Sequence, residues 1–420
     1  MLDDANHTQT PQRRFPEFRE PWEAWTIGDF LTESRIVGND GFAARKITVK
    51  LWGRGVFEKF ESLKGSENTQ YYKRRAGQFI YSKLDFLNQA FGIIPEHLDG
   101  FESTVDLPCF DISDALNPRF LLEYVQRPSF YKKHGDMADG GRKAKRIQVE
   151  SFLEFPIAVP SPPEQEKVAD CLTSLDEVIT AQGRKLEALK AHKKGLMQQL
   201  FAREGEPLPR LRFPEFRDAG EWKPRLLGDF INERSKIADG AVPLYSLTIE
   251  DGVTAKTERY ERSFLVRSKE EAYKVVLPND FAFNPMNLRF GAIARHSGHE
   301  PVALSKYYNI FNCDDSVDST FCHIYFRSDV MVALYDRIAT GSLIEKRRVH
   351  FDRFLKLAIP FPAIAEQQRI ADCVGSLDAR LAAEAEKLVA LKAHKKGLMQ
   401  QLFPKPEGVD ELAKSDSLRR

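Results

Sequence analysis

The sequence predicts an α+β protein in which two similar globular blocks are separated by two long helices that form an antiparallel coiled coil. Two observations carry this prediction. Residues 188–201 and 390–403 are identical, both reading ALKAHKKGLMQQLF at a separation of 202 positions, and each copy lies in an apolar heptad pattern. Each copy also follows a block that is long enough to bury its own core. A repeat of this length indicates two copies of one structural unit.

The repeat extends into a frame around each block. The segment RFPEFR at 14–19 recurs at 212–217, and Trp22 recurs as Trp222. Downstream, residues 152–160 align with 354–362 at the same separation as the identical segments. Between these framing segments the two halves differ strongly. The sequence therefore predicts one frame that is used twice around two different inserts.

The order of these segments gives the expected domain boundaries. The globular domains with their arms are expected at 14–160 and 204–362, and the long helices that follow them at 161–203 and 363–403. The two ends, 1–13 and 404–420, are expected to be disordered, because the tail in particular is rich in charged residues and serine.

Both long helices carry an apolar seam with steps of four and three residues, which is the heptad spacing of a coiled coil. Pro162 and Pro163 precede the predicted first helix, and the stretch EGEP after Arg203 ends it. The first seam contains Val168, Leu172, Leu175, Ile179, Leu186, Leu189, Leu196 and Leu200. The second contains Ile370, Val374, Leu377, Leu381, Leu388, Leu391, Leu398 and Leu402.

Polar residues fill the gaps in the seams and suggest a register. They are Gln182 and Lys193 in the first helix and Glu384 and Lys395 in the second. Two matched seams in one chain most simply bury each other. In an antiparallel pair, Lys193 opposite Glu384 also places Gln182 opposite Lys395, so we expect these two contacts. Two alternatives stay open: separate amphipathic helices, each packed on its own domain, and homodimerisation through the seams.

Inside the blocks the signals are mixed. Residues 272–277 and 321–326 are typical of strands, and residues 330–338 are typical of a helix. Faint correspondences link the blocks, between 78–81 and 280–283 and between 117–120 and 318–321. We therefore expect both blocks to share one fold.

Each block also contains a basic loop with glycine just before the downstream framing segment, GGRKAKR at 140–146 and GSLIEKRR at 341–348. Cations release counterions from DNA, and arginine can bind guanine with two hydrogen bonds in the major groove. The alternative is a solvated charged loop, but its repetition at matching places favours DNA binding. Aromatic or polar residues also interleave with cations at 71–75, 287–289 and 306–308, a weaker signal of the same kind, for which ordinary surface or core roles stay open. The predicted DNA-binding residues are Arg142, Lys143, Lys145, Arg146, Asn287, Arg289, Ser342, Lys346, Arg347 and Arg348.

Composition and missing motifs exclude several classes of protein. The net charge is only +1, so a site for a polyanion must be local. No apolar run is long enough for a membrane span and the N-terminus has no signal region, so we expect a soluble cytoplasmic protein without membrane contact. The chain lacks CxxC, HExxH, P-loop and dinucleotide-binding motifs. We therefore expect no metal site, no bound cofactor and no catalytic activity of its own.

Taken together, these features resemble a known family. The segments PSPPEQ at 160–165 and PAIAEQ at 362–367 open the two helices, and both helices end in GLMQQLF. Tandem variable blocks that are each followed by such a helix resemble the specificity subunit of type I restriction-modification systems, over residues 14–403. Thr340, Gly341 and Ser342 also look like the end of that family's target recognition domains. The first half departs from this pattern, with Asp139, Gly140 and Gly141 at that place.

The resemblance implies that each block is a target recognition domain for one half of an asymmetric bipartite target in double-stranded DNA, with the helix pair setting the spacer. It implies two modification subunits, which dock on the helices and methylate adenine, and ATP-dependent restriction subunits that translocate and cut DNA. S-adenosylmethionine, ATP and Mg would belong to these partners. The outer helix residues 190–195 recur identically at 392–397, which favours docking of two equal partners, although recent duplication also explains it.

A function of another class also fits the repeat. The chain could be a coiled-coil scaffold whose two globular domains bind proteins, and it would then show no salt-sensitive DNA binding. A fused restriction enzyme is disfavoured, because the methyltransferase motifs of such chains are missing here.

Overall fold

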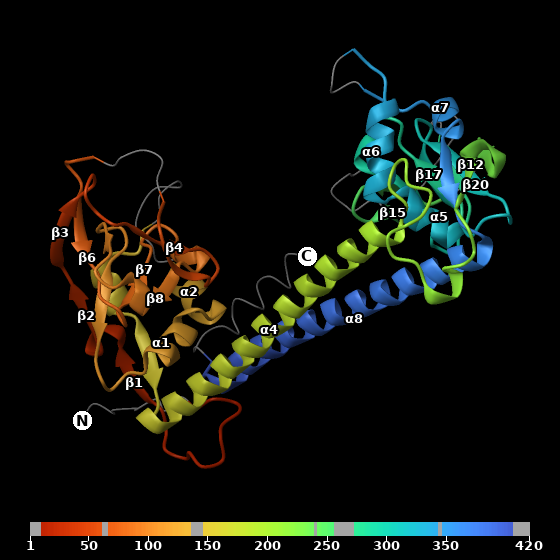
Figure 1. The fold of residues 1–420 in the computed structure, drawn as a ribbon. Coiled ribbons are helices and arrows are strands. Elements are labelled where there is room, and N and C mark those ends of the chain that lie inside the picture. The colour runs from red at the N-terminus through yellow and green to blue at the C-terminus, as the bar shows by residue number, and fades with distance from the viewer. Residues whose placement is uncertain are drawn as a thin grey trace, which may run out of the picture. The chain divides into compact units, whose positions relative to one another are not determined.

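The computed structural model of the protein describes residues 10–60, 66–135, 146–238, 242–255, 273–342 and 347–405 (Figure 1). The chain divides into two compact units: unit 1 comprises residues 1–183 and 387–420, and unit 2 comprises residues 184–386. Each unit therefore contains one globular block and parts of both long helices. Within the described ranges, no helix is long and apolar enough to cross a membrane. Most of the two ends predicted to be disordered, 1–9 and 406–420, lies outside those ranges.

The block of unit 1 is built on a four-stranded antiparallel sheet in the order β2–β10–β7–β8. Its strands are β2 (Leu31–Ser34), β10 (Cys109–Ile112), β7 (Phe79–Tyr81) and β8 (Phe91–Ile93). The other strands are β3 (Ile36–Asp40), β6 (Gln70–Lys73) and β9 (Glu102–Ser103) in one sheet, the pair β4 (Ile47–Lys50) and β5 (Gly55–Glu58), and the pair β1 (Glu23–Thr26) and β11 (Pro156–Val159). The helices are α1 (Pro118–Val125), α2 (Pro128–Gly135), α3 (Val149–Leu153) and the long α4 (Pro162–Leu200), with short 3-10 helices η1 (Ile27–Asp29), η2 (Phe86–Asn88) and η3 (Glu96–Leu98).

The block of unit 2 repeats this plan with the sheet order β13–β20–β17–β18. Its strands are β13 (Ile231–Arg234), β20 (Asn309–Cys313), β17 (Phe281–Phe283) and β18 (Ile293–Arg295). Three further pairs are β12 (Lys223–Leu226) with β21 (Ala358–Phe361), β14 (Tyr245–Thr248) with β15 (Gly252–Ala255), and β16 (Tyr273–Val276) with β19 (Val302–Ser305). The helices are α5 (Ser319–Phe326), α6 (Asp329–Ile338), α7 (Phe351–Leu355) and the long α8 (Ile364–Leu402), with η4 (Pro214–Phe216), η5 (Leu227–Asp229) and η7 (Leu288–Phe290).

The matching sheet orders confirm that the two blocks share a fold. The corresponding segments 78–81 and 280–283 hold the central strands β7 and β17. The segments 117–120 and 318–321 begin α1 and α5, where the side chains of Asn117 and Asp318 accept hydrogen bonds from backbone N–H groups of the first turn. The predicted strand at 272–277 and helix at 330–338 are confirmed as β16 and α6, although Ala272 lies outside the described residues.

The strand predicted at 321–326 is wrong, because this segment forms most of α5. Five of its six residues are buried, so the run is apolar on nearly every side. A short buried run has no periodicity that separates a helix from a strand. The cap at Asp318 decides the matter, since its carboxylate accepts from Phe321 N at 2.7 Å and starts the helix.

The end of a long helix completes each core. In unit 1, Leu402 and Phe403 at the end of α8 are buried, and the Phe403 ring lies 6.1 Å from Trp22 and 5.4 Å from Phe120 between ring centroids. In unit 2, the ring of Phe201 after α4 stacks on Tyr325 at 4.8 Å. The repeated LMQQLF sequence is therefore explained in part by packing within each block.

The repeated Glu-Gln pair at the start of each long helix ties the frame together. Arg14 binds Glu164 through two hydrogen bonds of 2.7 and 2.6 Å, and Arg212 binds Glu366 through two of 2.8 and 2.7 Å. Both glutamates are buried, and these hydrogen bonds raise the pKa of each arginine. The neighbouring Gln165 and Gln367 accept from the backbone N–H groups of Asn117 and Asp318, at 2.8 Å in both units.

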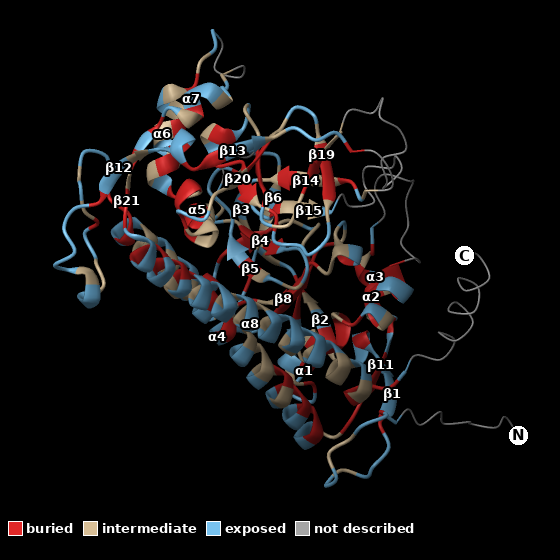
Figure 2. Ribbon diagram, turned by 90° about the vertical axis from the view of Figure 1, so that its right-hand side faces the viewer, coloured by how far each residue is buried: buried red, intermediate tan, exposed pale blue. Residues whose placement is uncertain are grey.

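Within each unit the parts of α4 and α8 run antiparallel, and Figure 2 shows that exposed and intermediate residues make up most of both helices. In unit 2, Lys193 binds Asp378 and Lys185 binds Glu384. In unit 1, Lys395 binds Asp176 at 2.7 Å. The residue numbers of the partners on α8 decrease from 395 to 378 as those on α4 increase from 176 to 193, so the two helices run in opposite directions.

The predicted register, with Lys193 opposite Glu384 and Gln182 opposite Lys395, is wrong by about one heptad. The observed register brings Leu172 and Leu398 into one core and Leu196 and Val374 into the other, so the apolar seam positions pair along the helix. The two seam lysines, Lys193 and Lys395, bind Asp378 and Asp176, which lie beside the seam, and Glu384 binds Lys185. A register based on polar seam positions alone leaves these partners out.

Because Phe403 packs in the core of the unit 1 block, its replacement should lower the stability of that block although Phe403 is distant from it in sequence. Phe403→Ala should destabilise unit 1 by about 3–5 kcal/mol, since it removes a buried ring from an aromatic core. Urea unfolding followed by tryptophan fluorescence measures this loss. Phe60→Ala is the control, because Phe60 is 86% exposed and should change stability by less than about 0.5 kcal/mol. Equal stability of the two variants contradicts the role of Phe403.

Candidate nucleic-acid interface

In unit 1 the loop after β7, and in unit 2 the loop after β17, is hydrogen-bonded to the end of the basic loop. In unit 2, Pro285 O accepts from Val349 N at 2.9 Å, and in unit 1, Lys83 O accepts from Ile147 N at 3.1 Å. We call each such arrangement a loop pair: residues 284–291 with 347–349, and residues 82–89 with 146–147. The unit 2 loop pair brings together Asn287, Arg289, Arg347 and Arg348, which the sequence placed in two separate candidate segments.

Two of these predicted DNA-binding arginines are held by the protein itself. Arg289 is 13% exposed, and its Nε lies 3.1 Å from a carboxylate oxygen of Asp336 on α6. Arg347 approaches the same carboxylate at 3.5 Å and donates to the backbone carbonyls of Asp336 at 2.6 Å and Ala339 at 3.2 Å. Arg347 therefore caps the C-terminal end of α6, where a cation interacts favourably with the helix dipole. Both arginines therefore connect the loop pair to α6 through Asp336.

The predicted DNA-binding residues that are exposed form a smaller surface than the full predicted set. Asn287, Ser342 and Arg348 are exposed in unit 2, and Arg146 is exposed in unit 1. Arg146 and Arg348 occupy equivalent places, each one residue before the hydrogen bond that joins its loop pair. Arg146 lies 3.7 Å from Asp106, a pair with both partners about half exposed that contributes little to stability. The predicted residues Arg142, Lys143, Lys145 and Lys346 lie outside the described residues.

One cation of the segment 71–75 belongs to the core. Arg74 is 2% exposed and donates to Ser103 Oγ at 2.8 Å and to Ser34 O at 2.7 Å. Its burial lowers the pKa of the guanidinium, although carbonyl and hydroxyl acceptors satisfy its donors. In the segment 306–308, by contrast, Tyr307 is 75% exposed beside Lys306. The alternation of aromatic and cationic residues in the sequence therefore does not distinguish a buried cation such as Arg74 from an exposed pair such as Lys306 and Tyr307.

The long helices carry a second group of predicted residues. Lys193 and Lys395 are equivalent, and each binds the equivalent aspartate, Asp378 or Asp176. In unit 1, Lys395 also binds the buried Glu123 at 2.9 Å. Burial raises the pKa of Glu123, while Lys395 opposes this shift. Burial lowers the pKa of Lys395, but Glu123 and Asp176 more than offset this, so that its pKa is raised overall.

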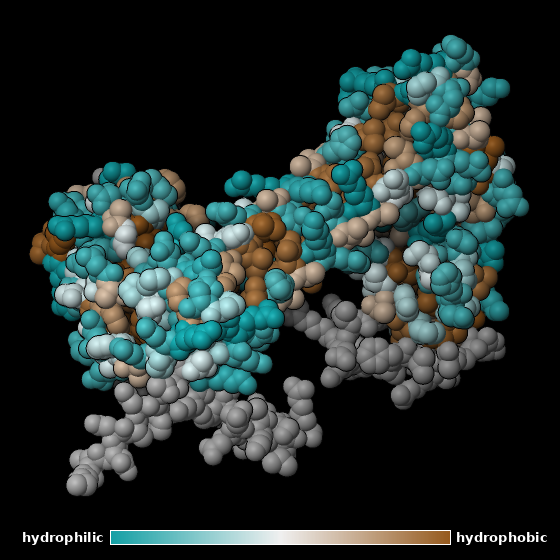
Figure 3. Space-filling view, turned by 90° about the horizontal axis from the view of Figure 1, so that it is seen from below, coloured by the Kyte–Doolittle hydropathy of each residue, from teal (hydrophilic) through white to brown (hydrophobic). Residues whose placement is uncertain are grey.

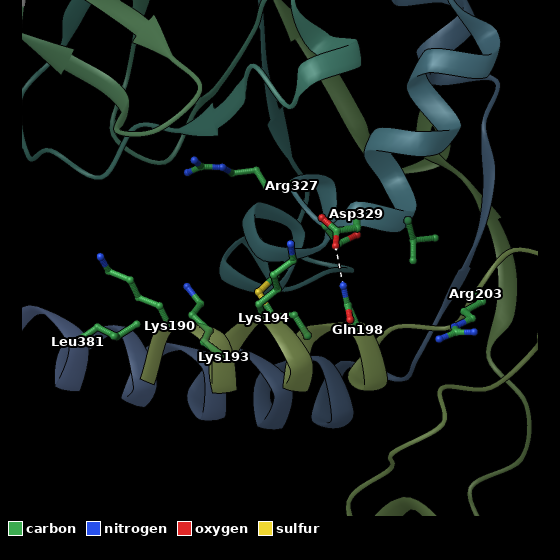
Figure 4. A pocket seen from close by; sticks show the side chains of 11 residues that line it. Lys190, Lys193, Lys194, Gln198, Arg203, Arg327, Asp329 and Leu381 are labelled. Atoms are coloured by element: carbon green, nitrogen blue, oxygen red, sulfur yellow. Dashed lines mark hydrogen bonds between the residues drawn. The ribbon is translucent and has the colours of Figure 1, made fainter. Parts of the chain in front are cut away.

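An open basic pocket of about 670 Å³ lies in unit 2 between α4 and the start of α6 (Figure 4). Lys190, Lys193 and Lys194 extend from α4 toward the side where Arg327 and Asp329 lie. Gln198 of α4 donates to Asp329 at 3.1 Å across the pocket. The identical repeat segment forms part of this surface, and the excess of cations there suits an acidic partner.

The described part of the chain holds no group of three or more His, Cys, Asp or Glu residues that could bind a metal ion. The candidate sites consist instead of exposed cations, amides and hydroxyls on loops and on one helix face. Such groups bind and orient a polyanion.

Three solved structures share this fold over 94% of the chain. One belongs to a structure that describes complex assembly and conformational transition of the type I R-M system, with a TM-score of 0.59, 14% identity and 99% of that chain covered. The second is the HsdS subunit from Thermoanaerobacter tengcongensis, with a TM-score of 0.51, 13% identity and 98% covered. The third is a type I restriction-modification S subunit from M. genitalium, with a TM-score of 0.51, 13% identity and 100% covered. No protein-family model and no curated protein matches the sequence.

The two arginines of the unit 2 loop pair should differ in their effect on stability. Arg347→Ala removes both hydrogen bonds to the end of α6 and should cost about 1–3 kcal/mol. Arg348→Ala should stay within about 0.5 kcal/mol of the unchanged protein, because Arg348 pairs with Thr340 through backbone atoms that alanine keeps. Thermal unfolding measures both. A larger loss for Arg348→Ala than for Arg347→Ala contradicts these roles.

Proposed function

We propose that this chain is the DNA sequence-recognition subunit of a type I restriction-modification complex. Each globular block reads one half of an asymmetric bipartite target, and the helices set the spacer between the half-sites. The observation that carries this proposal is the duplicated loop pair. It presents exposed cations at equivalent places on the two blocks. The four-stranded sheets of these blocks have the same strand order, but the surface residues differ.

The loop pairs have the chemistry that sequence reading needs. Arg146 and Arg348 supply exposed guanidinium groups that can bind phosphates or the edge of guanine. Asn287 and Ser342 add an amide and a hydroxyl that can bind base edges. The other half of each basic loop, with Arg142, Lys143, Lys145 and Lys346, remains part of the proposed contact surface. Because the two sets differ, two different half-sites follow.

The domain limits follow the same proposal. Target recognition domains occupy 14–160 and 204–362 with their arms, and the helix regions at 161–203 and 363–403 form the antiparallel coiled coil. The chain carries no catalytic step, and its partners supply S-adenosylmethionine, ATP and Mg. Two modification subunits dock on the outer faces of the helices, where Lys190 and Lys194 of the repeat are available around the basic pocket of unit 2. Restriction subunits complete the assembly.

Mapping of methylated adenines tests the proposal. The chain is co-expressed with the modification subunit encoded beside it, and methylated adenines are mapped across the host genome. We expect one bipartite motif with a fixed gap, which disappears when the chain is omitted. Methylation that does not depend on the chain contradicts the proposal, and stable protein complexes without salt-sensitive DNA binding favour the scaffold function.

Arg348→Ala tests the contact surface of unit 2. The variant should weaken DNA binding and reduce the slope of log K against log salt by about 0.9, the value for one lost phosphate contact. Fluorescence anisotropy with a duplex of the mapped target at several salt concentrations measures the slope. Lys223→Ala on β12 is the control, because Lys223 is an exposed cation outside the loop pair. Equal slopes for the two variants contradict the assignment.

Insertion into the helices tests the spacer. Four residues added after Gln182 and four after Glu384 lengthen each helix by about 6 Å, which corresponds to between one and two base pairs. The methylation map should then show both half-sites unchanged and a longer gap. A motif with the original gap contradicts the role of the helices in setting the spacer.

A further inference from the structure

We propose that Leu84 and Met286 contact the 5-methyl group of a thymine, one in each half-site, and so help to determine the sequence that each unit reads. This inference rests on the proposed function. It concerns apolar contacts, whereas the interface described above consists of cations, amides and hydroxyls.

The two residues occupy the same place in the two loop pairs. Each directly follows the residue whose carbonyl joins the pair, Lys83 in unit 1 and Pro285 in unit 2. The two loops also close in the same way, through Ser82 N to Ala90 O at 2.9 Å and Asn284 N to Ala292 O at 3.0 Å. The backbone therefore presents both side chains from equivalent positions.

Both side chains are large, apolar and exposed. Leu84 is 45% exposed and Met286 is 48% exposed. The face of the molecule in Figure 3 is largely hydrophilic with separate apolar patches, and a single exposed apolar residue is common on any protein surface. Exposure alone therefore carries little weight. Its recurrence at equivalent positions, in loops whose sequences have otherwise diverged, indicates that an apolar group is useful there.

The neighbouring charges indicate which ligand these positions contact. Arg146 lies one residue before Ile147 and Arg348 one residue before Val349, so in each unit an exposed guanidinium and an exposed apolar side chain flank one hydrogen bond. A cation beside an apolar group matches the major groove of DNA, where phosphates border the base edges. Thymine is the base that adds a methyl group to that groove.

A second exposed apolar residue, Trp52, is held against the loop that contains Leu84 in unit 1. The turn between β4 and β5 rests on the same loop, through Trp52 N to Asn88 O at 2.7 Å and Gly53 N to Gln89 O at 3.0 Å. Trp52 has a φ of 62°, a left-handed conformation that is rare for a bulky residue, and it is 55% exposed. The hydrogen bonds hold this strained residue at the surface. Strain of this kind concentrates at functional sites.

In unit 2, Phe290 is a second exposed apolar residue of the loop that contains Met286. The side chain of Phe290 is 53% exposed at the end of η7, in the same loop. The guanidinium carbon of Arg289 lies 4.6 Å from the Phe290 ring centroid, and Arg289 in turn is paired with Asp336 of α6. This chain of contacts limits the motion of the loop and so keeps its apolar residues in place.

Removal of single methyl groups from DNA tests the inference. The complex of the chain with its modification subunit is bound to duplexes of the mapped target in which each thymine in turn is replaced by deoxyuridine. For the unchanged chain, one replacement in each half-site should weaken binding roughly fourfold, the effect expected for one buried methyl group. Met286→Ala should bind the thymine and deoxyuridine forms of the unit 2 half-site equally. Leu84→Ala should do the same for the other half-site.

Matched variants separate a contact from a general effect. Ile249→Ala shortens a side chain that is 39% exposed in the turn between β14 and β15, and it should keep the full penalty for deoxyuridine. Met286→Leu should also keep most of it, because leucine retains an apolar tip. The inference is wrong if no thymine methyl contributes to binding, or if Met286→Ala keeps the same penalty. A bipartite motif in the methylation map together with such a result leaves the proposed function intact, whereas absence of the motif removes both.

Discussion

The burial of a helix end inside each globular core is the constraint on which the rest of this structure depends. Phe403 at the end of α8 lies among Trp22, Phe120 and Tyr124 in unit 1, and Phe201 after α4 stacks on Tyr325 in unit 2. Neither block can therefore complete its aromatic core from its own stretch of sequence. Because large buried rings contribute several kcal/mol each, the helices are parts of the folded units as well as connections between them.

The same constraint explains which segments are repeated in the two halves and which segments differ. The arm arginine binds the buried glutamate, the glutamine binds the start of α1 or α5, and the helix end packs in the aromatic core, so a change in any one leaves a buried charge, an unpaired polar group or a cavity. The loop pairs are each joined by a backbone hydrogen bond, and their position is held by Tyr81 in unit 1 and by Arg289 and Arg347 in unit 2. The exposed side chains of the loop pairs can therefore change without loss of the fold, which is the property that the proposed reading of two different half-sites requires.

The sequence was sufficient to predict the features that depend on periodicity and repetition. The two long helices and the shared fold of the blocks both left regular patterns in the sequence. The register of the helices did not, because Lys193 and Lys395 choose partners beside the seam, and Lys395 also binds Glu123 from the block. The roles of Arg289 and Arg347 also depended on the position of Asp336, which is distant from Arg289 in sequence. Exposed apolar residues such as Leu84 and Met286 could not be recognised from sequence, since exposure follows from the fold.

The differences between the two loop pairs show how one fold can hold two different loops in the same backbone arrangement. In unit 1 the hydroxyl of Tyr81 donates to Ile147 O at 3.1 Å and so fixes the end of the basic loop from the sheet. The equivalent residue in unit 2 is Phe283, which has no hydroxyl, and there Arg347 fixes the loop to the end of α6. The two loops thus reach equivalent backbone positions through different side-chain contacts. Because anchoring and presentation are separate in this way, the exposed residues of one loop pair can be exchanged while the other loop pair stays unchanged.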